Sequence, residues 1–176
     1  MQLRSVIASV VITSGLFASG VAVGFAAHRA EPWPYSDKSN QEAAQAMLQL
    51  AKVQADGGSW EQIAVGRVYY LSGSKPAGQA IFDEVLADEP EPSDLFRIAR
   101  VYREAGEWDR AKALFDRYVS EKPKDSGGIA EVGAYYLMQG DRKTAEALFD
   151  RSFKREPNVW ATVAAAGSYL GVVPQE

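Results

Sequence analysis

The hydrophobic and polar residues of this chain follow three successive patterns. An apolar stretch without a charged side chain runs over residues 5–27, and a short segment with two prolines and polar residues follows it. From about residue 41 onward, apolar residues recur at the three- and four-residue spacing of amphipathic helices. The pattern predicts a signal anchor or signal peptide at residues 1–30, a linker at 31–40 and a helical domain at 41–176.

Glycine and proline divide the helical domain into segments of helical length. Glycine ends a helix readily because it adopts the left-handed conformation, and proline cannot continue one. Eight helices are therefore predicted, at residues 41–55, 59–72, 76–88, 93–105, 109–121, 126–139, 142–155 and 159–171. The connections are short, which places consecutive helices side by side.

Six positions recur together three times in this domain. The first set is Gly66, Tyr69, Gly73, Gly78, Phe82 and Pro90. The second is Ala99, Tyr102, Gly106, Ala111, Phe115 and Pro123, and the third is Gly133, Tyr136, Gly140, Ala145, Phe149 and Pro157. Between the first and second sets, all six positions shift by the same number of residues. Between the second and third sets they again shift together, by one residue more. Small residues at these places let two helices of a pair approach closely, and the phenylalanine anchors their contact.

With these residues the chain resembles the tetratricopeptide repeat family, whose helix pairs recur about every 34 residues. The second and third sets match best, extended by Leu95, Ile98, Ile129 and Val132. The departures are Gln62, Leu95 and Ile129 at the place of the leading aromatic residue, and Gly78 at the place of an alanine.

The resemblance implies an all-α fold, a right-handed α-solenoid of about three helix pairs, preceded by an N-terminal apolar helix. The repeats are expected at about 59–91, 92–125 and 126–159, with capping helices on both sides. In helix 41–55, Ala44, Leu48 and Ala51 have the spacing of a repeat's second helix. Helix 159–171 has the character of a first helix, with Gly167 at the small-residue place.

In such a solenoid the first helices line a groove. By the resemblance and the helical period, the expected lining is Ile63, Arg67, Tyr70, Phe96, Arg100, Arg103, Ala130, Ala134 and Leu137. Arginine and aromatic residues together are typical of protein-binding surfaces, and the arginines would pair with acidic groups of a peptide. The alternative is that these arginines pair with acids of the chain itself, such as Glu104.

The last predicted helix carries no charge between residues 159 and 173. One face must pack on helix 142–155, which leaves the opposite face apolar, with Trp160 or Tyr169 as a contact residue. Exposed apolar patches mark contact surfaces, so a protein partner or a second copy of the chain is expected there. The alternative is that residues 172–174 fold back and cover the helix.

The apolar stretch over residues 5–27 would measure about 35 Å as a helix, enough to span a bilayer core of about 30 Å. Two interpretations stay open, an uncleaved anchor that holds the chain in a membrane through residues 5–27, and a cleaved signal peptide. Both predict an extracytoplasmic domain on the periplasmic side, anchored in the inner membrane or secreted to the periplasm. Arg4 and the terminal amine only narrowly outweigh Arg29 in setting the orientation.

Composition excludes several kinds of chemistry. The chain has no cysteine and one histidine, His28, which removes thiolate metal sites, disulfides and a histidine-based catalytic triad from the helical domain. The net charge of -4 gives no basic excess for nucleic acid. No catalytic residues, metal site or cofactor are predicted. The acidic residues between 83 and 94 lack the spacing of a calcium loop and are expected to be a solvated edge.

These observations predict a protein–protein interaction scaffold that is not an enzyme. It resembles membrane-anchored or exported bacterial tetratricopeptide repeat proteins, which implies a role in the assembly or maturation of an envelope or membrane complex. The alternative function is a structural accessory subunit of a membrane complex, bound mainly through its leader helix.

Overall fold

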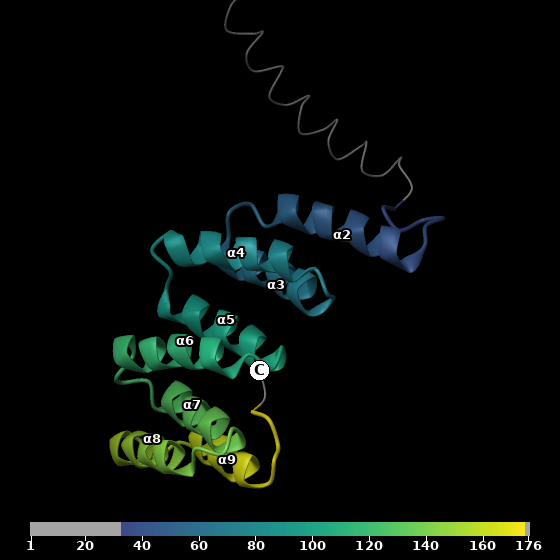
Figure 1. Ribbon diagram of the computed structural model, residues 1–176. Coiled ribbons are helices and arrows are strands. Elements are labelled where there is room, and N and C mark those ends of the chain that lie inside the picture. The colour runs from purple at the N-terminus through teal and green to yellow at the C-terminus, as the bar shows by residue number, and fades with distance from the viewer. Residues whose placement is uncertain (1–32, 175–176) are drawn as a thin grey trace, which may run out of the picture. The chain divides into compact units, whose positions relative to one another are not determined.

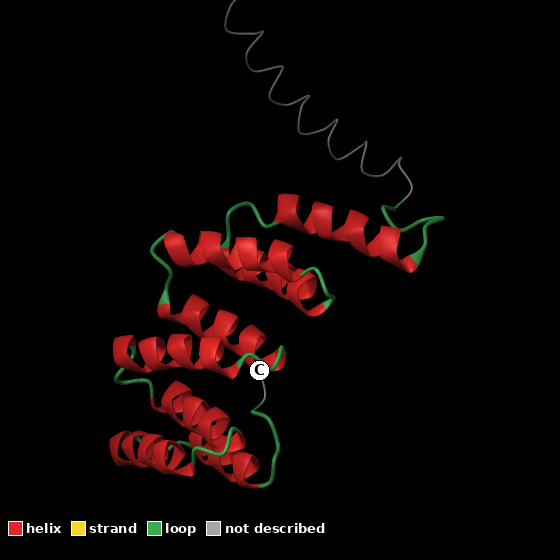
Figure 2. Ribbon diagram, in the orientation of Figure 1, coloured by secondary structure: helices red, strands yellow, loops and turns green. Residues whose placement is uncertain are grey.

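The computed structural model describes residues 33–174 of the chain. Its helices are α2 (Asn40–Gln54), α3 (Ser59–Leu71), α4 (Lys75–Ala87), α5 (Pro92–Glu104), α6 (Trp108–Glu121), α7 (Ser126–Met138), α8 (Arg142–Arg155) and α9 (Val159–Tyr169). No strand occurs among these described residues (Figure 2). All eight predicted helices are confirmed, with ends within two residues of the prediction. The apolar helix predicted near the N-terminus lies outside the described residues.

The chain forms two compact units that divide between Ala51 and Lys52. The described part of the first unit holds most of α2, and no residue of α2 is buried. The second unit holds α3 to α9 and contains the hydrophobic core.

The helices of the second unit pack in consecutive pairs. Helix α3 packs on α4, α5 on α6 and α7 on α8, and the pairs follow one another in chain order (Figure 1). A Cβ added at Gly66 would lie 2.6 Å from a ring carbon of Phe82, and one at Gly133 would lie 2.8 Å from Phe149. Phe82 and Phe149 therefore fill the space that the glycine of the first helix leaves open in these two pairs.

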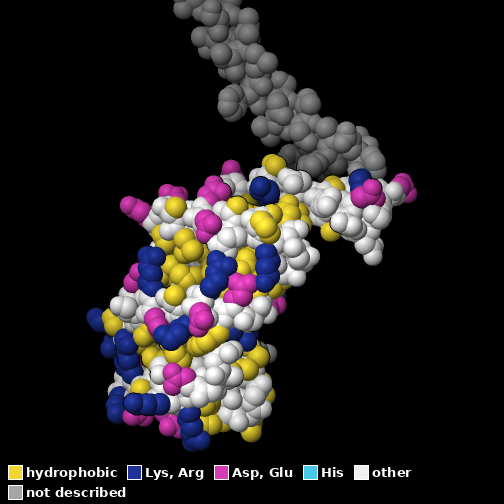
Figure 3. Space-filling model, viewed as in Figure 1, with side chains coloured by type: hydrophobic (Ala, Val, Ile, Leu, Met, Phe, Trp, Pro, Cys, Tyr) yellow, Lys and Arg dark blue, Asp and Glu magenta, His cyan; other side chains and the backbone are white. Residues whose placement is uncertain are grey.

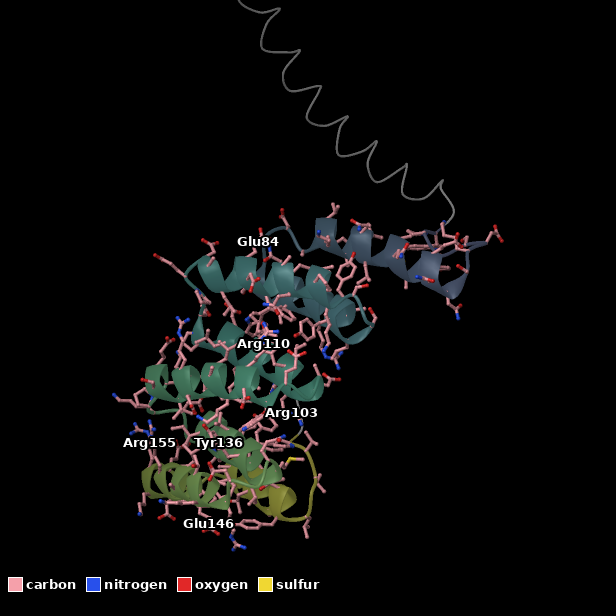
Figure 4. The ribbon with its side chains drawn as sticks, viewed as in Figure 1. Glu84, Arg103, Arg110, Tyr136, Glu146 and Arg155 are labelled. Carbon is pink, nitrogen blue, oxygen red and sulfur yellow. The ribbon has the colours of Figure 1, made fainter. Side chains whose placement is uncertain are left out.

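Tyrosines of the first helices contact the second helix of the preceding pair. The Tyr102 ring lies edge-on to Phe82 of α4 at 5.7 Å between centroids. The Tyr136 ring lies edge-on to Trp108 of α6 at 5.1 Å, and its hydroxyl donates to Asp116 of the same helix (Tyr136 is labelled in Figure 4). These aromatic contacts join one pair to the next.

Helix α9 follows the third pair and packs mainly on α7, with its C-terminal end against α8. Tyr169 packs on Phe149 of α8, with centroids 6.1 Å apart, and donates to Glu146 at 3.0 Å. Tyr169 takes the place of Tyr136 in the next repeat, so Ala166 corresponds to Gly133. The prediction that Gly167 occupies the small-residue place was wrong by one residue. The distance along the chain from Tyr136 to Tyr169 is one residue shorter than the distance from Tyr102 to Tyr136.

A polar network ties the first two pairs together at Glu107. The Tyr70 hydroxyl donates to Glu107 at 2.5 Å, Lys75 Nζ donates at 2.6 Å, and Arg110 donates at 3.0 Å. Arg110, labelled in Figure 4, also donates to the Tyr70 hydroxyl at 2.7 Å and to Gln79 at 2.5 Å. The hydrogen bonds from Lys75 and Tyr70 lower the pKa of Glu107 to about 2. Burial and the bond to Glu107 raise the pKa of Tyr70 to about 12.

Replacing Gly78 by alanine is expected to destabilise the protein by about 1–3 kcal/mol. A Cβ there would lie 2.6 Å from the Gly66 carbonyl oxygen and 2.7 Å from the Tyr70 amide nitrogen, both backbone atoms that cannot move aside. Gly127→Ala is the matched control, since its Cβ would meet only an Asp125 oxygen at 3.6 Å. Thermal unfolding of both variants checks this; equal melting temperatures would contradict the close crossing of α3 and α4.

Replacing Glu107 by glutamine is expected to cost about 1 kcal/mol of unfolding free energy at pH 7. Because the folded protein holds the pKa of this carboxylate at about 2, below its ordinary value of 4.5, its contribution is complete above pH 4.5. That contribution is lost as the pH falls through 4.5 toward 2. Denaturant unfolding at several pH values should show the wild type and Glu107→Gln converging in acid. Glu121→Gln, on an exposed pair with Arg117, should change little.

Candidate functional site

Two hollows lie along the first helices of the second unit. The first, the arginine hollow, has a volume of about 150 Å³ and lies between α3 and α5; its lining is Trp60, Ile63, Ala64, Arg67, Arg97, Arg100 and Val101. The second, the apolar hollow, has a volume of about 360 Å³ and lies between α7 and α9. Its lining is Gly127, Glu131, Trp160, Val163, Ala164, Gly167, Val172, Val173 and Pro174.

The two hollows are neighbours on one face. Arg97 and Glu131 occupy equivalent positions of adjacent repeats, on α5 and α7. Arg100 lines the arginine hollow, Glu131 lines the apolar hollow, and the Arg100 guanidinium donates to Glu131 Oε1 at 2.5 Å and 3.0 Å. We call this continuous surface the first-helix groove.

Two of the three predicted groove arginines pair with acids of the chain itself, which is the alternative stated in the sequence analysis for these residues. Arg67 donates to both carboxylate oxygens of Glu104 at 2.5 Å and 2.9 Å, and this pair is exposed. The Arg100–Glu131 pair is mostly buried, with 19% and 16% of the two side chains exposed. Burial opposes the charge of Arg100, yet the Glu131 carboxylate beside it keeps the pKa of Arg100 above its ordinary value. These pairs hold the two side chains in fixed positions across adjacent repeats.

Arg103 sits differently from the other two predicted arginines. Its guanidinium lies over the Tyr135 ring at 4.7 Å, and its buried Nε has no hydrogen-bond partner among the described residues. Burial, together with the charge of Glu131, raises the pKa of Tyr135 well above its usual range. Arg103 of α5 therefore packs on Tyr135 of α7 and joins these two first helices.

Arg97 lines the arginine hollow but is not among the predicted groove residues. Its guanidinium stacks on the Trp60 indole at 3.6 Å, and no carboxylate of the described residues pairs with it. Trp60 is 51% exposed. The helical period gave a signal for both residues, because Arg97 precedes Arg100 by one helical turn and Trp60 precedes Arg67 by two. The cation is thus presented on an aromatic platform at the mouth of the arginine hollow.

Most of the other predicted groove residues form the wall beneath the groove. The buried ones are Ile63, Tyr70, Phe96, Ala130 and Ala134, and Leu137 is half-buried. Phe96 packs on Phe115 and Tyr118 of α6 at 5.3 Å and 4.5 Å between ring centroids. Phe96 therefore faces its own second helix, Tyr70 bonds Glu107 and Arg110 of the next pair, and Ile63 lines the arginine hollow. Whether they contact a partner stays a prediction.

The C-terminal contact residues lie on opposite sides of α9. Trp160 lines the apolar hollow and is 73% exposed. Tyr169 packs on α8, where the Arg142 guanidinium lies 5.4 Å from its ring. The Val172 amide donates to the Gly167 carbonyl at 2.9 Å, so residues 172–174 turn back along the groove side of α9. A partner contact at Trp160 or Tyr169 remains a prediction.

Figure 3 shows side chains of both charges on the visible face, with several Lys and Arg side chains gathered at its lower left. Within residues 33–174, no cluster of three or more histidine, aspartate or glutamate side chains is placed to hold a metal ion. In that same range, no helix has both the length and the apolar character needed to cross a membrane.

A family model described as tetratricopeptide repeat matches residues 95–125, which comprise most of α5, all of α6 and the turn after it. The match supports the tetratricopeptide repeat family for this chain, and the consecutive helix pairs agree with it. Repeats of this family generally mediate protein–protein interactions and are generally non-catalytic. Comparison with curated proteins and with solved structures gave no match.

Proposed function

We propose that the chain is a non-catalytic scaffold whose first-helix groove binds a segment of a partner polypeptide. The observation that carries this proposal is the unpaired Arg97 guanidinium, held on Trp60 beside a hollow of about 150 Å³. An arginine that stacks on an exposed aromatic ring keeps its N–H donors free for an incoming acceptor.

The groove favours a segment with an acidic residue near one end and apolar residues near the other. Arg97 on α5 offers positive charge at the arginine hollow, whereas Arg67 on α3 is already paired with Glu104. Trp160, Val163 and Val173 offer apolar surface at α7 and α9. A segment that crosses the Arg100–Glu131 pair would reach both hollows, and its acid would be desolvated only in part, which keeps the cost of binding low.

The proposed setting is extracytoplasmic, with the domain exported by the apolar leader and tethered to a membrane if the leader is retained. The uncharged stretch of residues 5–27 supports this setting. A binding surface displayed there suits the assembly or maturation of an envelope or membrane complex. A structural accessory subunit, bound mainly through the leader, would instead need the leader and not the groove.

Arg97→Ala is expected to weaken binding of an acidic peptide at least about tenfold, because one charge-assisted contact contributes about 1.5–3 kcal/mol. The probe is a fluorescein-labelled short peptide with two glutamates followed by leucine and phenylalanine, titrated into the full chain by fluorescence polarisation. Arg117→Ala, which removes an exposed arginine on second helix α6, should bind as the wild type does.

Glu104→Gln sharpens the same test. It releases Arg67 from its ion pair, so binding of the peptide should tighten while Arg97→Ala weakens it. If neither variant changes the affinity, and replacing residues 5–27 abolishes the association of the full chain with its membrane complex, the accessory-subunit function replaces the scaffold.

N-terminal sequencing of the protein isolated from its membrane and soluble fractions tests the export part of the proposal. An anchored chain keeps its original N-terminus and stays with the membranes. A secreted chain begins near residue 27 and is soluble. An intact N-terminus in the cytosolic fraction alone would contradict both.

A further inference from the structure

Within residues 33–174, no second helix follows α9, whereas each preceding first helix packs against the second helix of its own pair. In α3, Ile63, Gly66 and Tyr70 are buried, and Gly66 and Tyr70 lie against Phe82 of α4. The registers of the repeats, anchored by Tyr136 and Tyr169, place Val163, Ala166 and Leu170 at the equivalent positions of α9. Val163 is 57% exposed and Leu170 is 82% exposed.

This uncovered surface of α9 is an apolar stripe. It consists of Val159, Val163, Ala166 and Leu170, which follow one another at intervals of about one turn along one side of the helix. The buried side of α9 is a different one, formed by Ala161, Ala165 and Ser168. Residues 172–174 line the apolar hollow and leave Val159 and Leu170 exposed.

Helix α2 has the residue pattern of a repeat's second helix. No first helix precedes it within the described residues. Helix α4 buries Gly78, Phe82 and Val85. At the equivalent places one repeat earlier, α2 has Ala44, Leu48 and Ala51, which share one side of that helix. No residue of α2 is buried. The chain thus carries an unpaired second helix near one end of the described region and an unpaired first helix near the other.

We propose that α9 of one copy takes α2 of a second copy as its missing second helix, which completes a fourth pair across two chains. The complete pairs define the fit, and the α5–α6 pair already has alanine at both small-residue places, Ala99 and Ala111, as the new pair would at Ala166 and Ala44. Phe82 lies over Gly66 and against Tyr70, so Leu48 of the second copy fits over Ala166 and against Leu170. Helix α9 has no charged side chain, so the contact adds no repulsion against Glu42 or Lys52 of α2.

The contact is head-to-tail, since it joins two different surfaces of the chain. Each bound copy leaves one α9 and one α2 free, so association continues to longer assemblies unless the rotation closes a ring. This assembly uses the stripe of α9 and leaves the arginine hollow open, whereas Val163 belongs both to the stripe and to the lining of the apolar hollow. Arg97→Ala therefore tests peptide binding without touching the α2–α9 contact, and Leu48→Glu tests that contact without touching the groove.

Complementation between two variants tests the proposal. Leu48→Glu disrupts the α2 side and Ala166→Glu disrupts the α9 side; Ala166 is exposed and Leu48 is half-buried. The full-length chain is studied in a mild non-ionic detergent by sedimentation equilibrium. Wild type should associate with increasing concentration, each variant alone should be monomeric, and an equimolar mixture should form one-to-one dimers and nothing larger. Val53→Glu, on the opposite face of α2 and 78% exposed, should associate as wild type does.

Other outcomes overturn the proposal. Association that survives both substitutions would come from the leader. Association lost with Ala166→Glu but kept with Leu48→Glu would mean that two α9 helices pair with each other. A wild-type chain that stays monomeric at all concentrations up to the solubility limit would also refute it. Circular dichroism of each variant should show unchanged helix content, which separates lost association from lost folding.

Disulfide trapping gives a second readout, because the natural sequence has no cysteine. A Cβ at Gly78 would lie 2.8 Å from the Tyr70 Cβ, and the equivalent positions are Ala44 of one copy and Leu170 of the other. A mixture of Ala44→Cys and Leu170→Cys chains should give a mixed dimer under mild oxidation at least tenfold faster than a mixture of Val53→Cys and Leu170→Cys. Equal rates would contradict the register.

Discussion

The aromatic ring that a first helix places on the preceding second helix is the contact on which the stack depends. A single helix pair buries one side of each helix and leaves its outer side apolar. Tyr102 on Phe82, Tyr136 on Trp108 and Tyr169 on Phe149 close these outer sides in turn. Because each ring belongs to the next pair, the stability of a pair depends on its neighbours.

The same stacking creates the groove and fixes its charges. First helices that stack in register bring side chains of different repeats into contact, as in the Arg100–Glu131 and Arg67–Glu104 pairs. The pairs hold two arginines in place, and they leave Arg97 on Trp60 as the cation available to a partner. Binding chemistry on this face is therefore a consequence of how the repeats are spaced.

Much of the fold was predictable from the sequence because its rules are local. Glycine and proline mark the helix ends, and the spacing of Tyr102 and Tyr136 marks the repeat. The groove was harder to predict, because neighbouring residues on one helix face different surfaces: Phe96 packs on α6, whereas Arg97 reaches the groove. The position of Gly167 was misjudged because a one-residue change in a connection shifts every following residue. The ion partner of Arg100 depends on contacts between repeats, which periodicity does not encode.

The most direct test of this account is a nuclear Overhauser measurement on the full chain with assigned aromatic protons. The account predicts cross-peaks between the rings of Tyr102 and Phe82 and between those of Tyr136 and Trp108 in the same spectrum, because the ring centroids lie 5.7 Å and 5.1 Å apart. Cross-peaks within the helix pairs, together with the absence of both inter-repeat cross-peaks, would show separate hairpins and contradict the stacked structure.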